Sequence, residues 1–400
     1  MYTVISPQLH YTNPNSFKML RSITTNRSLF HTLSPLINPA RILGLCPITY
    51  TKQKNFVTIR WSWKIYMANC ATALTLVCWG FWGFVHDMEI ASFVSLGFTG
   101  SVDVVISSFD ISDVLLSCLY FIVSMPFKCA KLSIVFHNLN KVDAIITPVF
   151  CDRFYSNLVW FSRCWFVFLP VLYTLDVFMW GNTSWLGVNN YFAYYVSYSI
   201  VVLHELQYYQ VVKMAQLRVS GINKTVKENI KKDTSRIKLE FIFDLIHCYN
   251  NTTDAIETIN SSFNKTVTLM LFSCYVHLVT CPYQLFVMIT SNETSILNYV
   301  YCLWVLLQIF RLVLVVEVCH NCEEEIQNTR ILVSQLLNCR LDKNVKKEAN
   351  TFLFLMVKKK IKFSAYGLPK VGRHLLLSVA SSIGGYWMIL LQFSSRTSKI

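Results

Sequence analysis

Seven apolar runs, each long enough to cross a lipid bilayer as a helix, constrain this chain more than any other feature. A helix needs about 20 mostly apolar residues to cross the hydrocarbon core. Apolar residues make up 54% of the chain and charged residues 14%, against about 25% charged residues in ordinary soluble domains. The sequence therefore predicts an all-α membrane protein with seven transmembrane helices and no second domain. The runs lie at 65–85, 104–125, 158–180, 188–212, 266–289, 296–318 and 375–393.

The positions of Lys and Arg predict how these helices are oriented, because both residues concentrate in cytoplasmic loops. Residues 1–64 contain no Asp or Glu and are rich in Lys and Arg, so we expect a cytoplasmic N-terminal tail. An N-terminal segment without acidic residues is also typical of a mitochondrial transit peptide. The basic residues of the other expected cytoplasmic loops favour a cytoplasmic tail instead. Segments 126–157, 213–265 and 319–374 are basic and expected inside, whereas the intervening segments 86–103, 181–187 and 290–295 contain no Lys or Arg. The short tail 394–400 is then extracellular.

Several classes of function are disfavoured by the composition and the motifs. The formal net charge is +14, but nucleic-acid binding needs basic residues clustered on a polar domain, and here apolar runs dominate. The sequence lacks HExxH, GxSxG and phosphate-loop patterns, so we expect neither an enzyme nor a resident cofactor. Cys319 and Cys322 have a spacing seen in metal sites, but without a second pair they indicate reduced thiols. We expect no metal and mostly free cysteines.

Acidic and aromatic side chains inside the runs mark a candidate ligand site. Asp110 and Asp113 are three residues apart, so a helix places them on one face of the second run; Asp176 lies in the outer half of the third. Ionisable side chains in hydrocarbon cost at least ~2.5–3.5 kcal/mol each, so they usually face protein or water. Trp180 ends the third run, and tyrosines recur at helical spacing in the fourth. A cavity lined by these groups would suit a cationic or amphipathic small molecule. The tyrosines are Tyr191, Tyr194, Tyr195 and Tyr198.

An alternative interpretation remains open for the same residues. Tyr and Trp are enriched at membrane interfaces whatever a protein does, and Asp110 could pair with a buried Arg such as Arg163. Glu205 and Arg311 fall in the inner halves of their runs, where a structural ion pair or snorkelling is the expected role. In the external segments, Asn182 and Asn292 begin sequons that are candidate glycosylation sites.

The last run carries a specific resemblance. Residues 385–393 read Gly-Tyr-Trp-Met-Ile-Leu-Leu-Gln-Phe, which is similar to the insect gustatory receptor signature of Thr-Tyr, five hydrophobic residues and Gln-Phe. Residues 363–368 resemble the segment that precedes this signature, and Gly44 to Pro47 resemble an N-terminal element of the family. Gly385 departs from the usual Thr. Small residues at 378–385 favour either close helix packing or a helix that lines a pore.

The resemblance implies a gustatory chemoreceptor of the plasma membrane: a tastant-gated, non-selective cation channel that forms a homo- or heterotetramer with other gustatory receptors. Tyr386, Gln392 and Phe393 then inherit the pore or gate positions, and 319–374 is an anchor between subunits. Sugar-sensing members resemble one another in carrying Glu directly after the motif Tyr, where this chain has Trp387, so a bitter or other non-sugar tastant is expected. The alternatives are a G-protein-coupled receptor, which predicts the reverse orientation, and a related odorant receptor.

Overall fold

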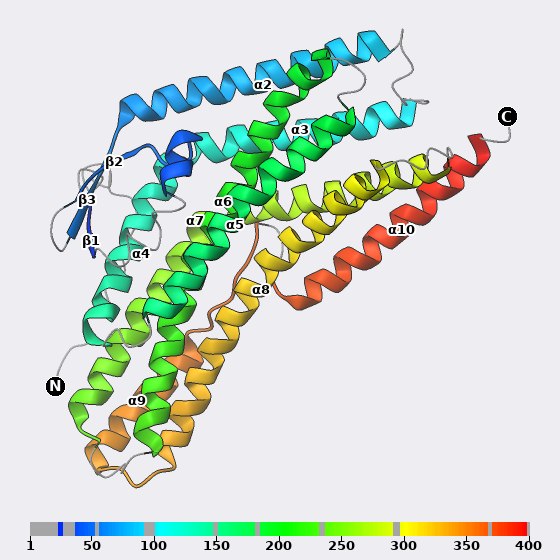
Figure 1. The fold of residues 1–400 in the computed structure, drawn as a ribbon. Coiled ribbons are helices and arrows are strands. Elements are labelled where there is room, and N and C mark those ends of the chain that lie inside the picture. The colour runs from blue at the N-terminus through cyan, green and yellow to red at the C-terminus, as the bar shows by residue number, and fades with distance from the viewer. Residues whose placement is uncertain are drawn as a thin grey trace.

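The structure is a computed structural model, and the residues that it describes are 23–26, 37–52, 56–91, 101–146, 151–180, 185–231, 237–290, 297–366 and 370–397. They form an elongated bundle of helices with a small sheet at one side (Figure 1). The helices are α2 (Trp63–Ala91), α3 (Ser101–Val123), α4 (Met125–Ile145), α5 (Cys151–Trp180), α6 (Trp185–Lys231), α7 (Leu239–Thr290), α8 (Leu297–Leu337), α9 (Lys343–Lys358) and α10 (Arg373–Thr397).

Five of these helices contain stretches that are apolar and long enough to cross a membrane. The other two expected spans lie within α6 and α10. Helix α6 is less apolar because it carries tyrosines and buried polar residues. Large side chains on α5, including Trp160, Val167 and Phe178, are exposed on the bundle surface, as expected for a helix that contacts lipid. The five stretches are 63–86, 105–123, 159–178, 239–286 and 298–337.

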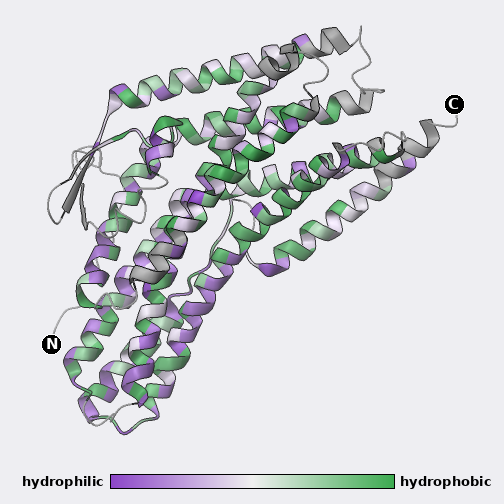
Figure 2. Ribbon diagram, viewed as in Figure 1, coloured by the Kyte–Doolittle hydropathy of each residue, from purple (hydrophilic) through white to green (hydrophobic). Residues whose placement is uncertain are grey.

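Helices α6, α7 and α8 are much longer than a bilayer is thick. They contain 47, 52 and 41 residues, or about 60–80 Å at 1.5 Å per residue, against a hydrocarbon core of about 30 Å. Their far ends are markedly more hydrophilic than the rest of the bundle (Figure 2). The sequence therefore continues as helix through much of 213–265 and 319–374, and α4 occupies most of 126–157.

The helix α9 closes the hydrophilic end of the bundle. Its Val345, Ala349, Phe352 and Met356 recur at helical spacing and are buried. They pack against α7 and α8, and Asp342 caps the helix by accepting a hydrogen bond from the Asn344 backbone N–H. In the sequence, Ile326, Leu332, Leu336 and Leu337 also recur near helical spacing, which predicts a helix there. These four residues are buried at the end of α8.

The N-terminal segment contains a three-stranded antiparallel sheet that the apolar-run search did not predict. Strands β1 (Ile23–Asn26), β2 (Ile48–Lys52) and β3 (Phe56–Trp61) pair in the order β1-β3-β2. The strands are 4–6 residues long, too short to register in a search for 20-residue runs. The segment before the first span is thus partly folded rather than a simple tail.

The backbone conformation of Gly44 explains why the N-terminal motif, residues 44–47, begins with a glycine. Its φ is +87°, a conformation that favours glycine, and an added Cβ would lie 3.2 Å from the Cβ of Asn69 on α2. The Asn69 side-chain amide donates to the Gly44 carbonyl at 3.1 Å. The motif therefore joins the N-terminal segment to the first span.

Candidate functional site

A buried ion pair between α6 and α8 lies at the centre of the candidate site. Arg311 donates from Nη2 to Glu205 Oε1 at 2.6 Å and from Nε to Oε2 at 2.8 Å. The two side chains are only 1% and 3% exposed. A bidentate pair of this geometry keeps two charges inside the bundle without leaving either unpaired. The structure confirms the structural ion pair expected for these residues.

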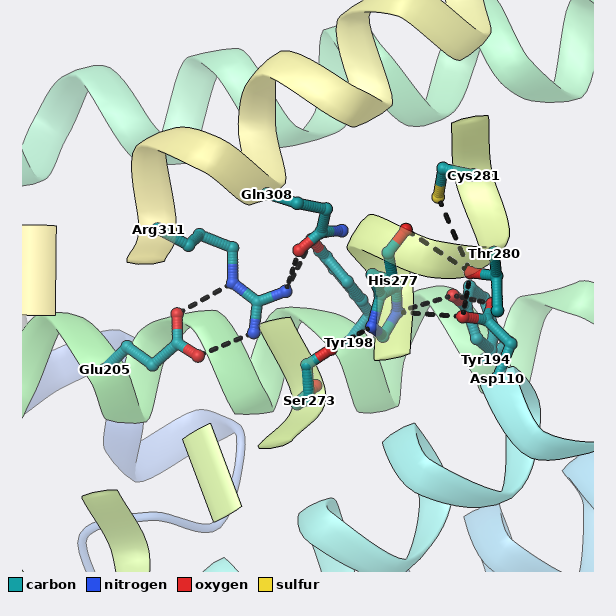
Figure 3. A network of polar contacts seen from close by, with 10 residues as sticks. All are labelled: Asp110, Tyr194, Tyr198, Glu205, Ser273, His277, Thr280, Cys281, Gln308 and Arg311. Atoms are coloured by element: carbon teal, nitrogen blue, oxygen red, sulfur yellow. Dashed lines mark hydrogen bonds and ion pairs between the residues drawn. The ribbon is translucent and has the colours of Figure 1, made fainter. Parts of the chain in front are cut away.

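The ion pair is extended by two further polar side chains (Figure 3). Arg311 Nη1 donates to the Tyr198 hydroxyl at 2.9 Å and to Gln308 Oε1 at 2.6 Å. Gln308 Nε2 donates to the same hydroxyl at 2.9 Å. Tyr198 thus connects the ion pair to the aromatic side of α6.

Asp110 on α3 forms the second polar group of the network. It accepts hydrogen bonds from the Tyr194 hydroxyl and from Thr280 Oγ1, both at 3.2 Å, and its Oδ1 lies 3.4 Å from His277 Nε2. The rings of His277 and Tyr198 are in contact, with centroids 5.8 Å apart, so this group adjoins the ion pair. The alternative that Asp110 pairs with Arg163 is wrong, because Arg163 is exposed on the surface of α5.

Asp176 on α5 forms a third group. It accepts a hydrogen bond from the Tyr195 hydroxyl at 2.5 Å and one from Trp304 Nε1 at 3.4 Å. Tyr173 packs on both partners, with ring centroids 4.9 Å from Tyr195 and 6.2 Å from Trp304. The Tyr194 and Tyr195 rings are 6.0 Å apart, which places the two acids on either side of one aromatic cluster.

The structure therefore brings together most of the residues that the sequence selected. Asp110, Asp176 and the tyrosines at 194, 195 and 198 meet between α3, α5, α6, α7 and α8. Asp113 is half-buried on α3 and its Oδ2 has no hydrogen-bond partner within the described residues. Tyr191 is half-buried. Asn182, Asn292 and the side chain of Trp180 lie outside the part that the structure describes.

Four residues of the network were missed in the sequence. His277, Thr280, Trp304 and Gln308 lie inside apolar runs, where a polar side chain needs a partner. A search for every polar residue in the runs, rather than for acids and tyrosines, would have found them.

Cys319 and Cys322, whose spacing is seen in metal sites, both lie on α8. Both thiols are buried and free, and the Tyr208 hydroxyl lies 3.0 Å from Cys319 Sγ. Among the described residues, no three His, Cys, Asp or Glu side chains are arranged to hold a metal ion.

Helix α10 contacts the bundle through one face and leaves another face open. The Tyr275 hydroxyl on α7 lies 2.9 Å from Ser382 Oγ, and the Tyr275 ring contacts Tyr386 at 6.3 Å. Tyr386 is still 53% exposed, and a Cβ added at Gly384 or Gly385 would meet no atom within 4 Å. Gln392 is exposed, whereas the side chain of Phe393 lies outside the described part.

The segment that joins α9 to α10 is fixed to α7 and α8 by polar contacts. Glu323 is 5% exposed; it accepts from the Phe363 backbone N–H at 2.8 Å and pairs with Lys370 at 3.0 Å. At the first residue of α10, Arg373 forms two hydrogen bonds of 2.7 and 2.8 Å with Glu317 on α8. The start of α10 is therefore attached directly to the helix that carries Arg311.

Comparisons with known proteins agree with this architecture. A family model described as 7tm chemosensory receptor matches residues 33–397. A Drosophila melanogaster protein named gustatory receptor for sugar taste 43a is 32% identical over 138 residues; the match spans 34% of this chain and 32% of that protein, about a third of its length.

Solved structures show the same fold. The insect olfactory receptor OR5 from Machilis hrabei superposes with a TM-score of 0.61 at 16% identity, and its complex with eugenol with a TM-score of 0.65 at 14% identity. Each comparison covers 91% of this chain and 98% of the receptor. The predicted seven-span helical membrane fold is confirmed.

Proposed function

We propose, from the premise that this chain belongs to the 7tm chemosensory receptor family, that it is a gustatory receptor of the plasma membrane that works as a tastant-gated, non-selective cation channel. The observation that carries the proposal is the family match over residues 33–397, joined to the gustatory signature at 385–393. The partial similarity to a Drosophila gustatory receptor supports the gustatory branch. In this proposal, residues 1–64 and 319–374 are cytoplasmic, 394–400 is extracellular, and 375–393 lines the pore.

The polar and aromatic network supports a small-molecule site in the outer half of the bundle. One structural neighbour is an olfactory receptor in complex with eugenol, a small organic molecule. Asp110 and Asp176 each already accept a tyrosine hydroxyl, so a ligand with a cationic or hydrogen-bond-donating group would compete with those hydroxyls. Such a ligand favours the open channel only to the extent that it binds the open state more tightly. Trp387 in place of the Glu of sugar-sensing members favours a bitter or other non-sugar compound.

Substitution of the two acids tests the ligand site. Asp110→Asn and Asp176→Asn keep the shape of each side chain but remove its charge, so we expect dose–response curves for a cationic tastant to shift by about tenfold, the loss of one charge-assisted hydrogen bond. Glu228→Gln on the exposed far part of α6 is the matched control, because that carboxylate is 52% exposed. Unchanged potency in both Asp variants would remove the acids from the site.

Substitution of Gln392 tests the pore assignment independently. Gln392→Ala removes the amide from the exposed side of α10, so we expect altered single-channel conductance or ion selectivity with normal surface expression. Tyr299→Ala is a suitable control, since Tyr299 is 74% exposed on α8. An unaltered conductance in Gln392→Ala would contradict a pore-lining position.

An olfactory receptor is the second candidate function, because the fold match extends over most of the solved olfactory receptor. The two functions differ in the ligand rather than in the channel. Recordings with panels of non-volatile plant compounds and of volatile compounds would separate them, and responses confined to volatiles would favour the second candidate.

A further inference from the structure

A lysine and a histidine meet inside the bundle outside the network described above. Lys128 on α4 is 3% exposed and His204 on α6 is fully buried. Lys128 Nζ lies 2.9 Å from His204 Nε2, and the other ring nitrogen of His204 lies 3.1 Å from Gln207 Oε1. Two basic groups are therefore in direct hydrogen-bond contact in the interior.

The surroundings of this pair are aromatic rather than acidic. Lys128 Nζ lies 5.5 Å from the ring centroid of Tyr120 and 5.3 Å from that of Phe121, both on α3, and 5.7 Å from that of Phe263 on α7. Within the described residues, no carboxylate lies within ion-pair distance of Lys128. The nearest acid in sequence to His204, Glu205, is engaged by Arg311.

The titratable groups that face the pair can be named helix by helix. Helix α3 presents the Tyr120 phenol beside the Lys128 side chain, and α4 presents the half-buried Cys129 thiol next along the chain. Helix α6 presents the uncharged Gln207, and α7 presents the Phe263 ring. None of these groups supplies a compensating negative charge near neutral pH.

The contact can hold only one positive charge without a large penalty. A hydrogen bond between the two nitrogens needs one donor and one acceptor, so either the lysine or the histidine is neutral on the facing side. Two positive charges 2.9 Å apart, away from water and without an acid, would repel strongly. Burial lowers the pKa of Lys128 to about 7, close to the pH of a cytoplasm.

The pair also occupies a junction between two helices. Helix α3 ends at Val123, and α4 begins at Met125. Ser124 between them donates its backbone N–H to the Tyr120 carbonyl at 2.9 Å and its hydroxyl to the Phe121 carbonyl at 3.2 Å. Lys128 lies on the first turn of α4, where the second membrane span gives way to a helix that packs along α7. A change in the Lys128 contact therefore acts on the angle between a membrane span and the cytoplasmic part of the bundle.

We propose that the Lys128–His204 pair is a sensor of cytoplasmic pH that modulates gating. Protonation of Lys128 places a positive charge in a dry site that has no carboxylate among the described residues. This charge moves the side chain toward water, weakens its contact with His204 and shifts α4 relative to α6 and α7. The gating part rests on the proposed channel function, whereas the proton uptake does not.

Thermal unfolding of the purified full chain tests the proton uptake without any current. Between about pH 7 and about pH 10, an unfolded Lys128 binds a proton that the folded protein excludes, so stability and melting temperature rise with pH over this window. Lys128→Met should lose this rise. Lys131→Met, the matched control, should keep it, because Lys131 is exposed one turn along the same helix.

The outcomes of this experiment are distinct. A wild-type melting temperature that does not rise over the window overturns the proposal, and so does a rise that Lys128→Met retains. If Lys128→Met fails to fold, Lys128→Gln preserves a hydrogen-bond donor toward His204 and gives the same comparison.

Inside-out patches test the gating part. At a fixed sub-saturating ligand concentration, the wild-type current should change by at least about twofold between cytoplasmic pH of about 6 and about 8. Lys128→Gln should flatten this dependence and Lys131→Met should not. A wild-type current that is independent of cytoplasmic pH overturns the sensor, whereas the absence of ligand-evoked current in every form, wild type included, counts against the proposed channel function instead.

Discussion

At the scale of single residues, the stability of the fold depends strongly on the buried Glu205–Arg311 ion pair. Each side chain is almost completely buried, so removal of either charge leaves the other without a partner. We expect Glu205→Gln to lower the free energy of unfolding by about 3–5 kcal/mol, measured by thermal unfolding in detergent or as lost surface expression.

The control for this prediction is a solvent-exposed ion pair on the surface of the protein. Lys224 and Glu228 on α6 lie 3.9 Å apart and are 46% and 52% exposed. Glu228→Gln should change stability by less than about 1 kcal/mol, because solvent screens exposed pairs. Equal effects of the two glutamate substitutions would mean that Glu205 is not held in a dry environment.

At the scale of secondary-structure elements, two acids of α8 with different exposure hold the segment between α9 and α10 and the start of α10. Glu323 is 5% exposed and accepts a backbone hydrogen bond, whereas Glu317 is 28% exposed and its partner Arg373 is 58% exposed. Glu323→Gln should therefore cost about 1–3 kcal/mol and Glu317→Gln no more than about 1 kcal/mol. Unfolding curves of the two variants check the order, and the reverse order would contradict the described docking of the segment.

The elements also show what the sequence could and could not predict. The spans were predictable because an apolar stretch of about 20 residues has few other stable environments. A hydropathy search marks only the lipid-embedded part of a helix, so the continuation of α6, α7 and α8 beyond the membrane was predictable only from the helical spacing of apolar residues in the long loops. An ion pair for Arg311 could be expected from the cost of an intramembrane charge, but its bidentate geometry depends on packing between α6 and α8. The contacts of Asp110 with Tyr194 and His277, rather than with Arg163, likewise depend on how the helices pack.

At the scale of the whole molecule, the proposed channel function depends on the orientation of the chain in the membrane. The segments 86–103, 181–187 and 290–295 contain no Lys or Arg, and among the segments expected outside only the tail carries them, at Arg396 and Lys399. We therefore expect the N-terminus inside and the C-terminus outside. Antibody access to epitope tags should detect the C-terminal tag in intact cells and the N-terminal tag only after permeabilisation. An N-terminal tag accessible in intact cells would reverse the topology and favour a G-protein-coupled receptor.

The open face of α10 is a second property of the whole molecule. Leu377 and Met388 are 75% and 66% exposed in the single chain, and the small residues between them leave room for close approach of another helix. In the proposed tetramer this face meets the pore and the neighbouring subunits. Cross-linking through cysteines placed at 384 and 385 should then give dimers and higher oligomers in membranes; a product that stays monomeric would contradict that arrangement.

The ion pair between α6 and α8 also imposes an order on biosynthesis. Glu205 and Arg311 are 106 residues apart, so at about 5–20 residues per second the ribosome makes the arginine about 5–20 s after the glutamate. During that interval α6 carries a carboxylate whose insertion into lipid alone costs about 2.5–3.5 kcal/mol. The helix is therefore expected to wait beside the translocon until α8 emerges. A chain that stops before α8 would carry an unpaired carboxylate within a membrane helix. Cellular quality control can recognise an incomplete receptor by such a group.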